Sequence, residues 1–174
     1  SNFVKVICKC NQIWNMKFFK NKILLDIKKK VGEKSVICGL SGGVDSTVTA
    51  VLIDKALGKK LVCVFVDTGL MRENERSEIE FLFKTNFKIK LKVIDASKIF
   101  FEKLKGVSDP EKKRKIIGNE FVKIFENFAL KQKNIKFLAQ GTLYPDVIES
   151  LSKVGKKSVT IKSHHNVGGL PKKM

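Results

Sequence analysis

Short apolar runs alternate along this chain with longer stretches in which apolar residues recur every three or four positions. The first pattern is typical of buried strands and the second of amphipathic helices. Such alternation favours right-handed crossovers and a parallel sheet covered by helices on both faces. The sequence therefore predicts an α/β fold with an open, mainly parallel five-stranded sheet. The predicted strands are residues 35–40, 60–67, 89–96, 136–140 and 158–162, and the predicted helices are residues 15–31, 45–57, 73–84, 111–131 and 146–154.

A chain of 174 residues is long enough for one domain with its own core. Residues 1–14 lack a clear period and are predicted to be the remnant of an interdomain linker, which assigns residues 15–174 to the domain. No apolar run approaches the roughly 18 residues that span a membrane, and the N-terminal residues are not expected to form a secretory signal. We therefore expect a soluble, cytoplasmic protein without a membrane partner.

The net charge of +18 raises nucleic acid as a partner. Almost all of this charge comes from lysines spread along the chain, whereas proteins that bind nucleic acid favour the bidentate fork of arginine. Compositional drift in an A/T-rich genome explains the lysines better than an RNA-binding surface does. We therefore expect no nucleic-acid partner.

The four cysteines lack the C-x-x-C spacing of metal or redox sites. Cys38 and Cys63 fall inside predicted strands, where thiols are usually inert. A metal site that combines Cys8 and Cys10 with the two histidines has the wrong spacing. The cysteines are predicted to be reduced and structural.

The stretch LSGGVDS, residues 40–46, leaves a predicted strand and enters a predicted helix. In open parallel sheets, ligands bind beyond the carboxyl ends of the strands. Gly42 and Gly43 allow the backbone to approach an anion closely, and the helix start presents N–H groups with the positive end of the helix dipole. Ser41 and Ser46 can add hydroxyl donors, and Asp45 is a carboxylate suited to Mg²⁺. The alternative is a simple glycine-rich connection in which Asp45 or Ser46 caps the helix.

The complete string resembles the pyrophosphate-binding SGGxDS loop of the PP-loop ATP pyrophosphatases. It is not a Walker A loop, because no G-x-x-x-x-G-K-[ST] is present. Four further stretches, VFVDTGLMRENE, GVSDPEKKRKIIGNEFVKIFE, LAQGTLYPDVIES and IKSHHNVGGLP, resemble in the same order the ATP-pyrophosphatase domain of the glutamine-hydrolysing GMP synthetases. The resemblance covers nearly the whole chain from about residue 3. Thr47 departs from it, because a second serine is common there.

This resemblance implies a ligase of purine biosynthesis that uses ATP and Mg²⁺. ATP adenylates the C2 oxygen of xanthosine monophosphate (XMP) with release of pyrophosphate, and ammonia then displaces AMP to form GMP. A glutaminase domain or subunit is the implied ammonia source. A C-terminal dimerisation domain, which makes the full-length enzyme a homodimer, is also implied, and both domains lie outside these 174 residues.

The resemblance also assigns site residues. Val66 and Asp67 are expected to line the adenosine pocket through backbone contacts, with the Val66 side chain in the core. The residues implied to hold ATP and pyrophosphate are Gly39, Leu40, Ser41, Gly42, Gly43, Val44, Asp45, Ser46, Val66 and Gly141.

Asp45 and Asp146 are the implied metal ligands, and Asp45, Asp146, Glu149 and Lys162 are the implied catalytic residues. Asp146 and Glu149 lie one turn apart on a predicted helix entered through proline, where acids also occur simply because the helix dipole favours them. Lys162 can offset phosphate charge as the α–β bond breaks.

Arg114, His164 and His165 are implied on the substrate side. Adjacent histidines in extended chain point to opposite sides, so at most one of the pair is expected to face the phosphates. Arg114 lies in a basic run whose ordinary role is a solvated helix face. Two other functions stay open: another PP-loop synthetase, either tRNA-modifying or NAD-forming, and a non-catalytic module that binds nucleotide or RNA.

Overall fold

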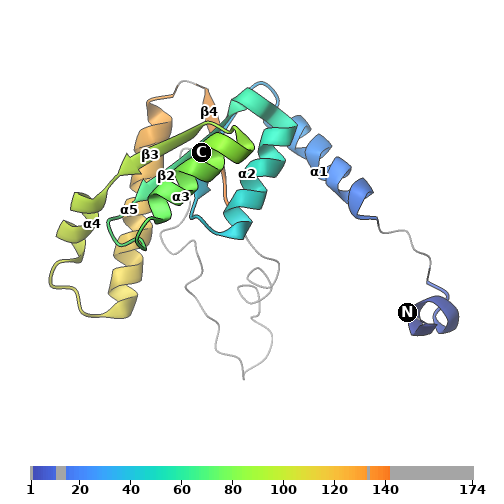
Figure 1. Cartoon of the computed structure of the whole chain (residues 1–174), viewed down its shortest axis with the longest axis horizontal. Coiled ribbons are helices and arrows are strands. Elements are labelled where there is room, and N and C mark those ends of the chain that lie inside the picture. The colour runs from blue at the N-terminus through green and yellow to red at the C-terminus, as the bar shows by residue number, and fades with distance from the viewer. Residues whose placement is uncertain (1, 11–14, 133, 142–174) are drawn as a thin grey trace.

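The computed structural model describes residues 2–10, 15–132 and 134–141. Four parallel strands form one sheet in the order β3-β2-β1-β4 (Figure 1). The α/β fold with a parallel sheet is confirmed, but the described sheet has four strands where five are predicted, because residues 158–162 lie outside the described residues. The elements are η1 (Phe3–Ile7), α1 (Met16–Val31), β1 (Ser35–Leu40), α2 (Val44–Leu57), η2 (Gly58–Lys60), β2 (Leu61–Asp67), α3 (Glu75–Phe81), η3 (Leu82–Phe87), β3 (Leu91–Asp95), α4 (Ser97–Leu104), α5 (Pro110–Leu130) and β4 (Ile135–Ala139).

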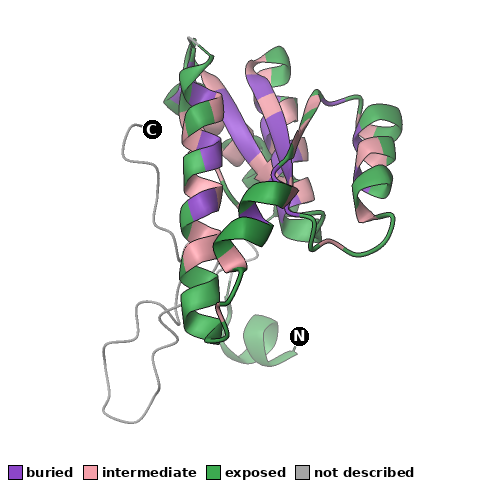
Figure 2. Cartoon of the chain, turned by 90° about the vertical axis from the view of Figure 1, so that its left-hand side faces the viewer, coloured by how far each residue is buried: buried purple, intermediate pink, exposed green. Residues whose placement is uncertain are grey.

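Helices cover both faces of the sheet, because side chains along each strand alternate between two cores. On one face, residues of β1 and β2 such as Cys38 and Phe65 pack against α1, α2, α3 and η3. On the other face, residues such as Ile37 and Val64 pack against α4 and α5. Figure 2 shows the buried residues gathered in the strands, while the outward faces of the helices are exposed.

The strand order creates a switch point beside β1. The chain passes from β1 to β2 and β3 on one side, then crosses through α4 and α5 to place β4 on the other side of β1. Ligands of open α/β sheets bind at this kind of point, outside the carboxyl ends of the strands. The segments that follow β1 and β4 therefore meet where a ligand site is expected.

Helix α4 was not predicted. The sequence predicted a strand through residue 96, but β3 ends at Asp95, whose Oδ1 accepts hydrogen bonds from the Ser97 backbone N–H at 3.0 Å and the Ser97 hydroxyl at 2.7 Å. This arrangement ends the strand and starts the helix within two residues. Phe100 of α4 is fully buried and lies 5.3 Å from the Phe121 ring, between ring centroids. The apolar residues Phe100, Phe101 and Leu104 recur at a helical spacing, so a local signal for this helix was present in the sequence and was missed.

The other helix boundaries differ modestly from the predictions. The predicted helix 73–84 is divided into α3 and the π-helical η3, in which Phe83 and Phe87 pack edge to face at 5.4 Å. A π-helical turn, η1, occupies part of the predicted linker. None of the described helices combines the length and the apolar character that crossing a lipid bilayer requires.

Candidate functional site

Residues 41–43 join the end of β1 to the start of α2 at the switch point. Together with the first residues of α2 they form the segment that we call the Ser41–Ser46 loop. Gly43 is the N-cap residue of α2, with φ −78° and ψ 164°, and no side chain caps this helix. In contrast, Asn15 caps α1 and Asp109 caps α5 through their side chains. The alternative in which Asp45 or Ser46 caps α2 is therefore wrong. The first N–H groups of α2 keep no side-chain cap and can donate to an anion.

Two serine hydroxyls shape the loop from within. The buried Ser46 Oγ accepts a hydrogen bond from the Ser41 backbone N–H at 3.2 Å and donates to the Gly43 carbonyl oxygen at 3.0 Å. Ser41 Oγ accepts from the Gly43 N–H at 3.3 Å and lies 3.2 Å from Ser46 Oγ. Because the Ser46 proton is directed to Gly43, Ser41 is the donor in the contact between the two hydroxyls, and it can turn this proton to a ligand by giving up that contact. Only one of the two expected hydroxyl donors is available in this geometry.

Gly42 lies directly against α3. Its φ is +80°, and a Cβ at this position would lie 2.7 Å from Ile79 Cδ1 and 3.2 Å from Glu75 Oε1. Both the backbone conformation and the contact therefore require glycine here. The loop is shaped by its own hydroxyls on one side and by α3 on the other.

Asp45 lies in the first turn of α2 and is exposed. A carboxylate is favoured electrostatically near a helix N-terminus. Mg²⁺ is commonly bound by one or two carboxylates together with substrate phosphates, so an exposed carboxylate beside the uncapped N–H groups fits a Mg²⁺–phosphate ligand. Among the described residues no group of three or more His, Cys, Asp or Glu side chains is placed to hold a metal ion.

Gly141 follows β4 and closes the site from the other side of β1. A Cβ at Gly141 would lie 3.0 Å from both the carbonyl carbon and oxygen of Asp45. Gly39, within β1, has the Phe125 ring 2.9 Å from the same hypothetical atom. The structure thus brings the expected residues Gly39–Ser46 and Gly141 together. Leu40 is buried in the core, whereas Val44 is 77% exposed.

Val66 presents its backbone, not its side chain, toward this loop. The side chain is buried in the core that faces α4 and α5, as expected. The carbonyl oxygen of Asp67 accepts a hydrogen bond from the Ala96 backbone N–H, so this carbonyl points toward β3. The carbonyls of neighbouring residues in a strand point to opposite sides, so the Val66 carbonyl points toward β1. The β1–β2 ladder ends at the pair Leu40–Phe65, so this carbonyl lies past the last strand pair.

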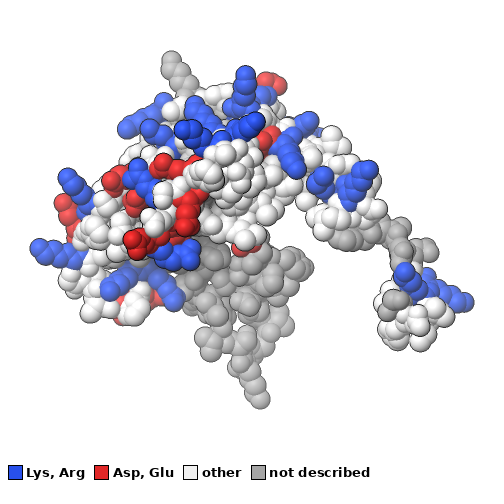
Figure 3. All heavy atoms as spheres, viewed as in Figure 1, with Lys and Arg blue, Asp and Glu red and all other residues white. Residues whose placement is uncertain are grey.

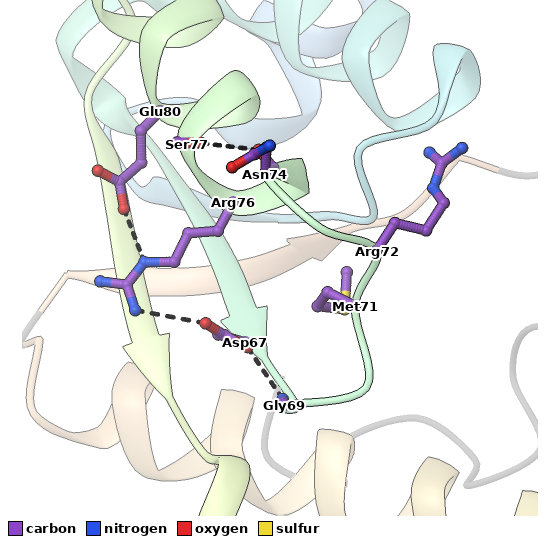
Figure 4. A pocket seen from close by; sticks show the side chains of 8 residues that line it. All are labelled: Asp67, Gly69, Met71, Arg72, Asn74, Arg76, Ser77 and Glu80. Carbon is purple, nitrogen blue, oxygen red and sulfur yellow. Dashed lines mark hydrogen bonds and ion pairs between the residues drawn. The ribbon is translucent and has the colours of Figure 1, made fainter.

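Asp67 belongs to an ion-pair chain that the sequence analysis missed. Arg76 of α3 donates from Nη1 to Asp67 Oδ2 at 3.3 Å and from Nε to Glu80 Oε1 at 3.0 Å (Figure 4). The hydrogen bonds to Glu80 and Asp67 raise the pKa of the Arg76 guanidinium above its usual value. These residues line a cavity of about 440 Å³, together with Gly69, Met71, Arg72, Asn74 and Ser77.

Glu75 belongs to the stretch RENE, but the sequence did not identify it as a site residue. Its side chain is only 14% exposed, and Oε2 accepts from the Arg72 backbone N–H at 3.0 Å and lies 3.5 Å from Arg72 Nε. Oε1 faces Gly42. Glu75 lies three residues after Arg72, and Glu80 lies four residues after Arg76. This spacing was the available sequence signal for both pairs.

Of the remaining predicted site residues, the structure describes only Arg114. Arg114 lies on α5 and forms an ion pair with Glu111 at 3.6 Å; its side chain is 58% exposed. Asp146, Glu149, Lys162, His164 and His165 lie outside the described residues.

The thiols of Cys38 and Cys63 face each other across β1 and β2 and are fully buried. Both are free thiols. The hydrogen bond between the two thiols and the burial of the side chain raise the pKa of Cys63 well above its usual range, whereas the same hydrogen bond lowers the pKa of Cys38. Full burial keeps both thiols away from a substrate, which argues against thiol chemistry at these two positions.

On the face of the molecule drawn in Figure 3, the lysines do not form one stripe. Figure 3 shows Lys and Arg side chains scattered over the visible face and interspersed with acids. This distribution agrees with the expectation drawn from the spread of lysines in the sequence.

A family model described as NAD synthase matches residues 17–134, which is more than half of the chain. The chain belongs to the NAD synthase family. The resemblance to GMP synthetases is confirmed as well, because curated proteins named glutamine-hydrolysing GMP synthase match almost the whole chain. The protein of Brachyspira hyodysenteriae is 58% identical over 99% of this chain and 34% of its own length. The proteins of Mesoplasma florum and Thermotoga maritima are each 55% identical over 98% and 100% of this chain.

The chain spans about a third of the length of these relatives. Among solved structures, the NH3-dependent NAD synthetase of Campylobacter jejuni superposes with a TM-score of 0.62 at 19% identity, over 80% of this chain and 73% of that one. An NMN synthetase of Francisella tularensis superposes with a TM-score of 0.58 at 17% identity, over 71% of this chain and 53% of that one. At these identities the likeness shows a shared fold.

Proposed function

We propose that this chain is the ATP-activating part of a glutamine-hydrolysing GMP synthase. In this role it adenylates XMP with release of pyrophosphate, and ammonia then replaces AMP to form GMP. The observation that carries the proposal is the uncapped start of α2, which follows the SGGVDS loop at the switch point of the sheet. Identity of 53–58% to proteins named GMP synthase supports the same reaction.

The loop residues suit the pyrophosphate half of ATP. The uncapped N–H groups of α2 and the Ser41 hydroxyl donate to phosphate oxygens, and the buried Ser46 keeps the loop in shape. Fixed donors of this kind need no reorganisation when charge moves onto the leaving group, which is why they stabilise it. Bound Mg²⁺ supplies additional positive charge on the pyrophosphate, with Asp45 and Asp146 as the carboxylates proposed to hold it.

The Val66 carbonyl, past the end of the β1–β2 ladder, suits the adenosine half. Lys162, Glu149, Arg114, His164 and His165 complete the proposal on the phosphate and XMP sides. Ammonia is supplied by a glutaminase domain or subunit, and a dimerisation domain completes the XMP site. The linker assignment of residues 1–14 and the cytoplasmic location stay predictions.

The NAD-forming alternative is not favoured. The solved structures show the fold alone, whereas relatives at 53–58% identity are named GMP synthase. A tRNA-modifying role that uses Cys38 or Cys63 as a nucleophile is disfavoured by their burial.

The first experiment tests the site through Asp45. Calorimetry with ATP and with pyrophosphate, each with and without Mg²⁺, should show binding by the 174-residue chain and a loss of the Mg²⁺-dependent part in Asp45→Asn. Asp26→Asn, which changes an exposed acid on α1, serves as the control. Unaltered Mg²⁺ dependence in Asp45→Asn would remove this residue from the site.

The second experiment tests the reaction. We expect the 174-residue chain to bind ATP but to form little GMP from XMP and ammonia, and a longer protein that includes the dimerisation domain to form it. Adenylation requires the XMP oxygen in line with the α-phosphate, and complete positioning can contribute about 7–11 kcal/mol. In the longer protein, Lys162→Met should slow adenylation more than it weakens ATP binding. Equal GMP formation by both proteins would show that the XMP site is misplaced.

A further inference from the structure

The carboxyl end of β2 is held from several directions. Gly69 N–H donates to Asp67 Oδ1 at 2.9 Å, and Ala96 N–H donates to the Asp67 carbonyl oxygen at 2.8 Å. Gly69 itself, with φ +72°, has Phe101 and Ser97 atoms 2.8 Å from the position of an added Cβ, so the turn is pressed against α4. Arg76 contacts the remaining carboxylate oxygen of Asp67 from α3.

Arg76 differs from an ordinary surface ion pair in its geometry. Exposed pairs contribute little, because both side chains lose entropy and water screens the charges. The Asp67 side chain, however, is only 17% exposed, and both of its oxygens are engaged. Glu80, one turn along α3, holds the Nε side of the same guanidinium, so the planar group is fixed by two carboxylates (Figure 4).

The contact lies one residue from the group that the proposed function uses. The Val66 carbonyl and the Asp67 N–H belong to the same peptide group, so a movement of the Asp67 backbone also moves that carbonyl. We infer that Arg76 is a positioning residue that holds the end of β2, through Asp67, in the orientation in which the Val66 carbonyl meets the adenosine half of ATP. This inference rests on the proposed function, because it takes ATP as the ligand.

The inference predicts that variants of Arg76 lose affinity for ATP but not for a ligand that lacks the adenosine. Inorganic tripolyphosphate carries the phosphates of ATP without the adenosine, so it reports on the Ser41–Ser46 loop alone. In Arg76→Met, ATP should bind about tenfold more weakly, the scale of one lost hydrogen bond to a charged group, and tripolyphosphate should bind as before. Arg76→Lys keeps the charge and should recover part of the ATP affinity.

The control is Lys60→Met. It removes an ion pair of 3.0 Å with Glu33 at the amino end of β2, away from the carboxyl edge, and should change neither affinity. If Arg76→Met does not fold, Glu80→Gln and Asp67→Asn provide the same comparison, since each keeps an oxygen acceptor while removing the charge.

Calorimetry of wild type and variants with both ligands decides the matter. Failure of the wild-type chain to bind ATP would count against the proposed function. A wild type that binds ATP, with variants that lose both ligands equally or lose neither, would overturn the positioning role of Arg76 and leave the proposed function standing. A selective loss of ATP affinity, partly recovered by Arg76→Lys, is the expected result.

Discussion

The side chain of Ile79, from α3, occupies the space that a side chain at Gly42 would need. This contact joins the loop that follows β1 to a helix that follows β2. It presses the loop against the core on the α1–α3 face of the sheet, where Ile79 is buried. The loop is thus part of the packed structure rather than a free connection.

Gly42→Ala should therefore destabilise the protein and weaken ATP binding. The positive φ costs roughly 1–2 kcal/mol in a residue with a Cβ, and overpacking against Ile79 adds about 1–3 kcal/mol. Gly32→Ala is the matched control, because Gly32 also has a positive φ, +56°, but nothing within 4 Å of an added Cβ. Urea unfolding and pyrophosphate calorimetry should show the larger loss of stability, and any loss of binding, only in Gly42→Ala.

Ser46→Ala should disturb the conformation of the Ser41–Ser46 loop and lower the free energy of unfolding. The substitution removes two hydrogen bonds, one from the Ser41 N–H and one to the Gly43 carbonyl, which are worth about 0.5–1.5 kcal/mol each. Thr47→Val keeps the side-chain volume and removes one hydrogen bond of 2.9 Å to the same carbonyl, so it should cost less, about 0.5–1.5 kcal/mol. Equal unfolding free energies for the two variants would show that Ser46 does not organise the loop.

The cysteines should separate into two classes in thiol labelling followed by mass spectrometry. Cys8 and Cys10 are exposed and should react in the native protein, whereas Cys38 and Cys63 are fully buried and should react only after unfolding. Because the pKa of Cys63 is raised, mildly alkaline pH should not expose it to alkylation. Rapid native labelling of Cys63 would contradict this arrangement of β1 and β2.

The stability that Asp95 contributes should depend on pH. Hydrogen bonds from Ser97 lower the pKa of Asp95 below its ordinary value of 3.8, so the native state favours the ionised form. Its contribution is present above the unfolded pKa and is lost as the pH falls from there through the lower folded pKa. Ser97→Ala should therefore lower the unfolding free energy at neutral pH and lose this effect in acid. A difference that is constant with pH would assign the effect to packing of α4 alone.

The sequence by itself determined the layered α/β class and most of the elements. The spacing of apolar residues distinguishes the continuous apolar runs of β1 and β2 from the helices α1, α2 and α5. A strand buried on both faces is apolar throughout, whereas a helix buried on one face has apolar residues every three or four positions. It also determined the chemistry of the Ser41–Ser46 loop, since the glycines, hydroxyls and acid are neighbours in the chain. The resemblance to GMP synthetases could also be recognised from the sequence, because the motifs of that family follow one another in the same order.

Only the tertiary structure decided how these pieces meet. The order β3-β2-β1-β4 brings Gly141 against Asp45, and packing of α3 places Ile79 and Glu75 under Gly42. The same packing directs Arg76 to Asp67, and burial of Phe100 holds α4 against the sheet. The contacts of Gly141 with Asp45 and of Gly42 with Ile79 join residues far apart in the chain, so they depend on strand order and crossover direction, which no local pattern encodes. The role of Ser46 changed for the same reason, because the folded loop turns its proton inward to Gly43.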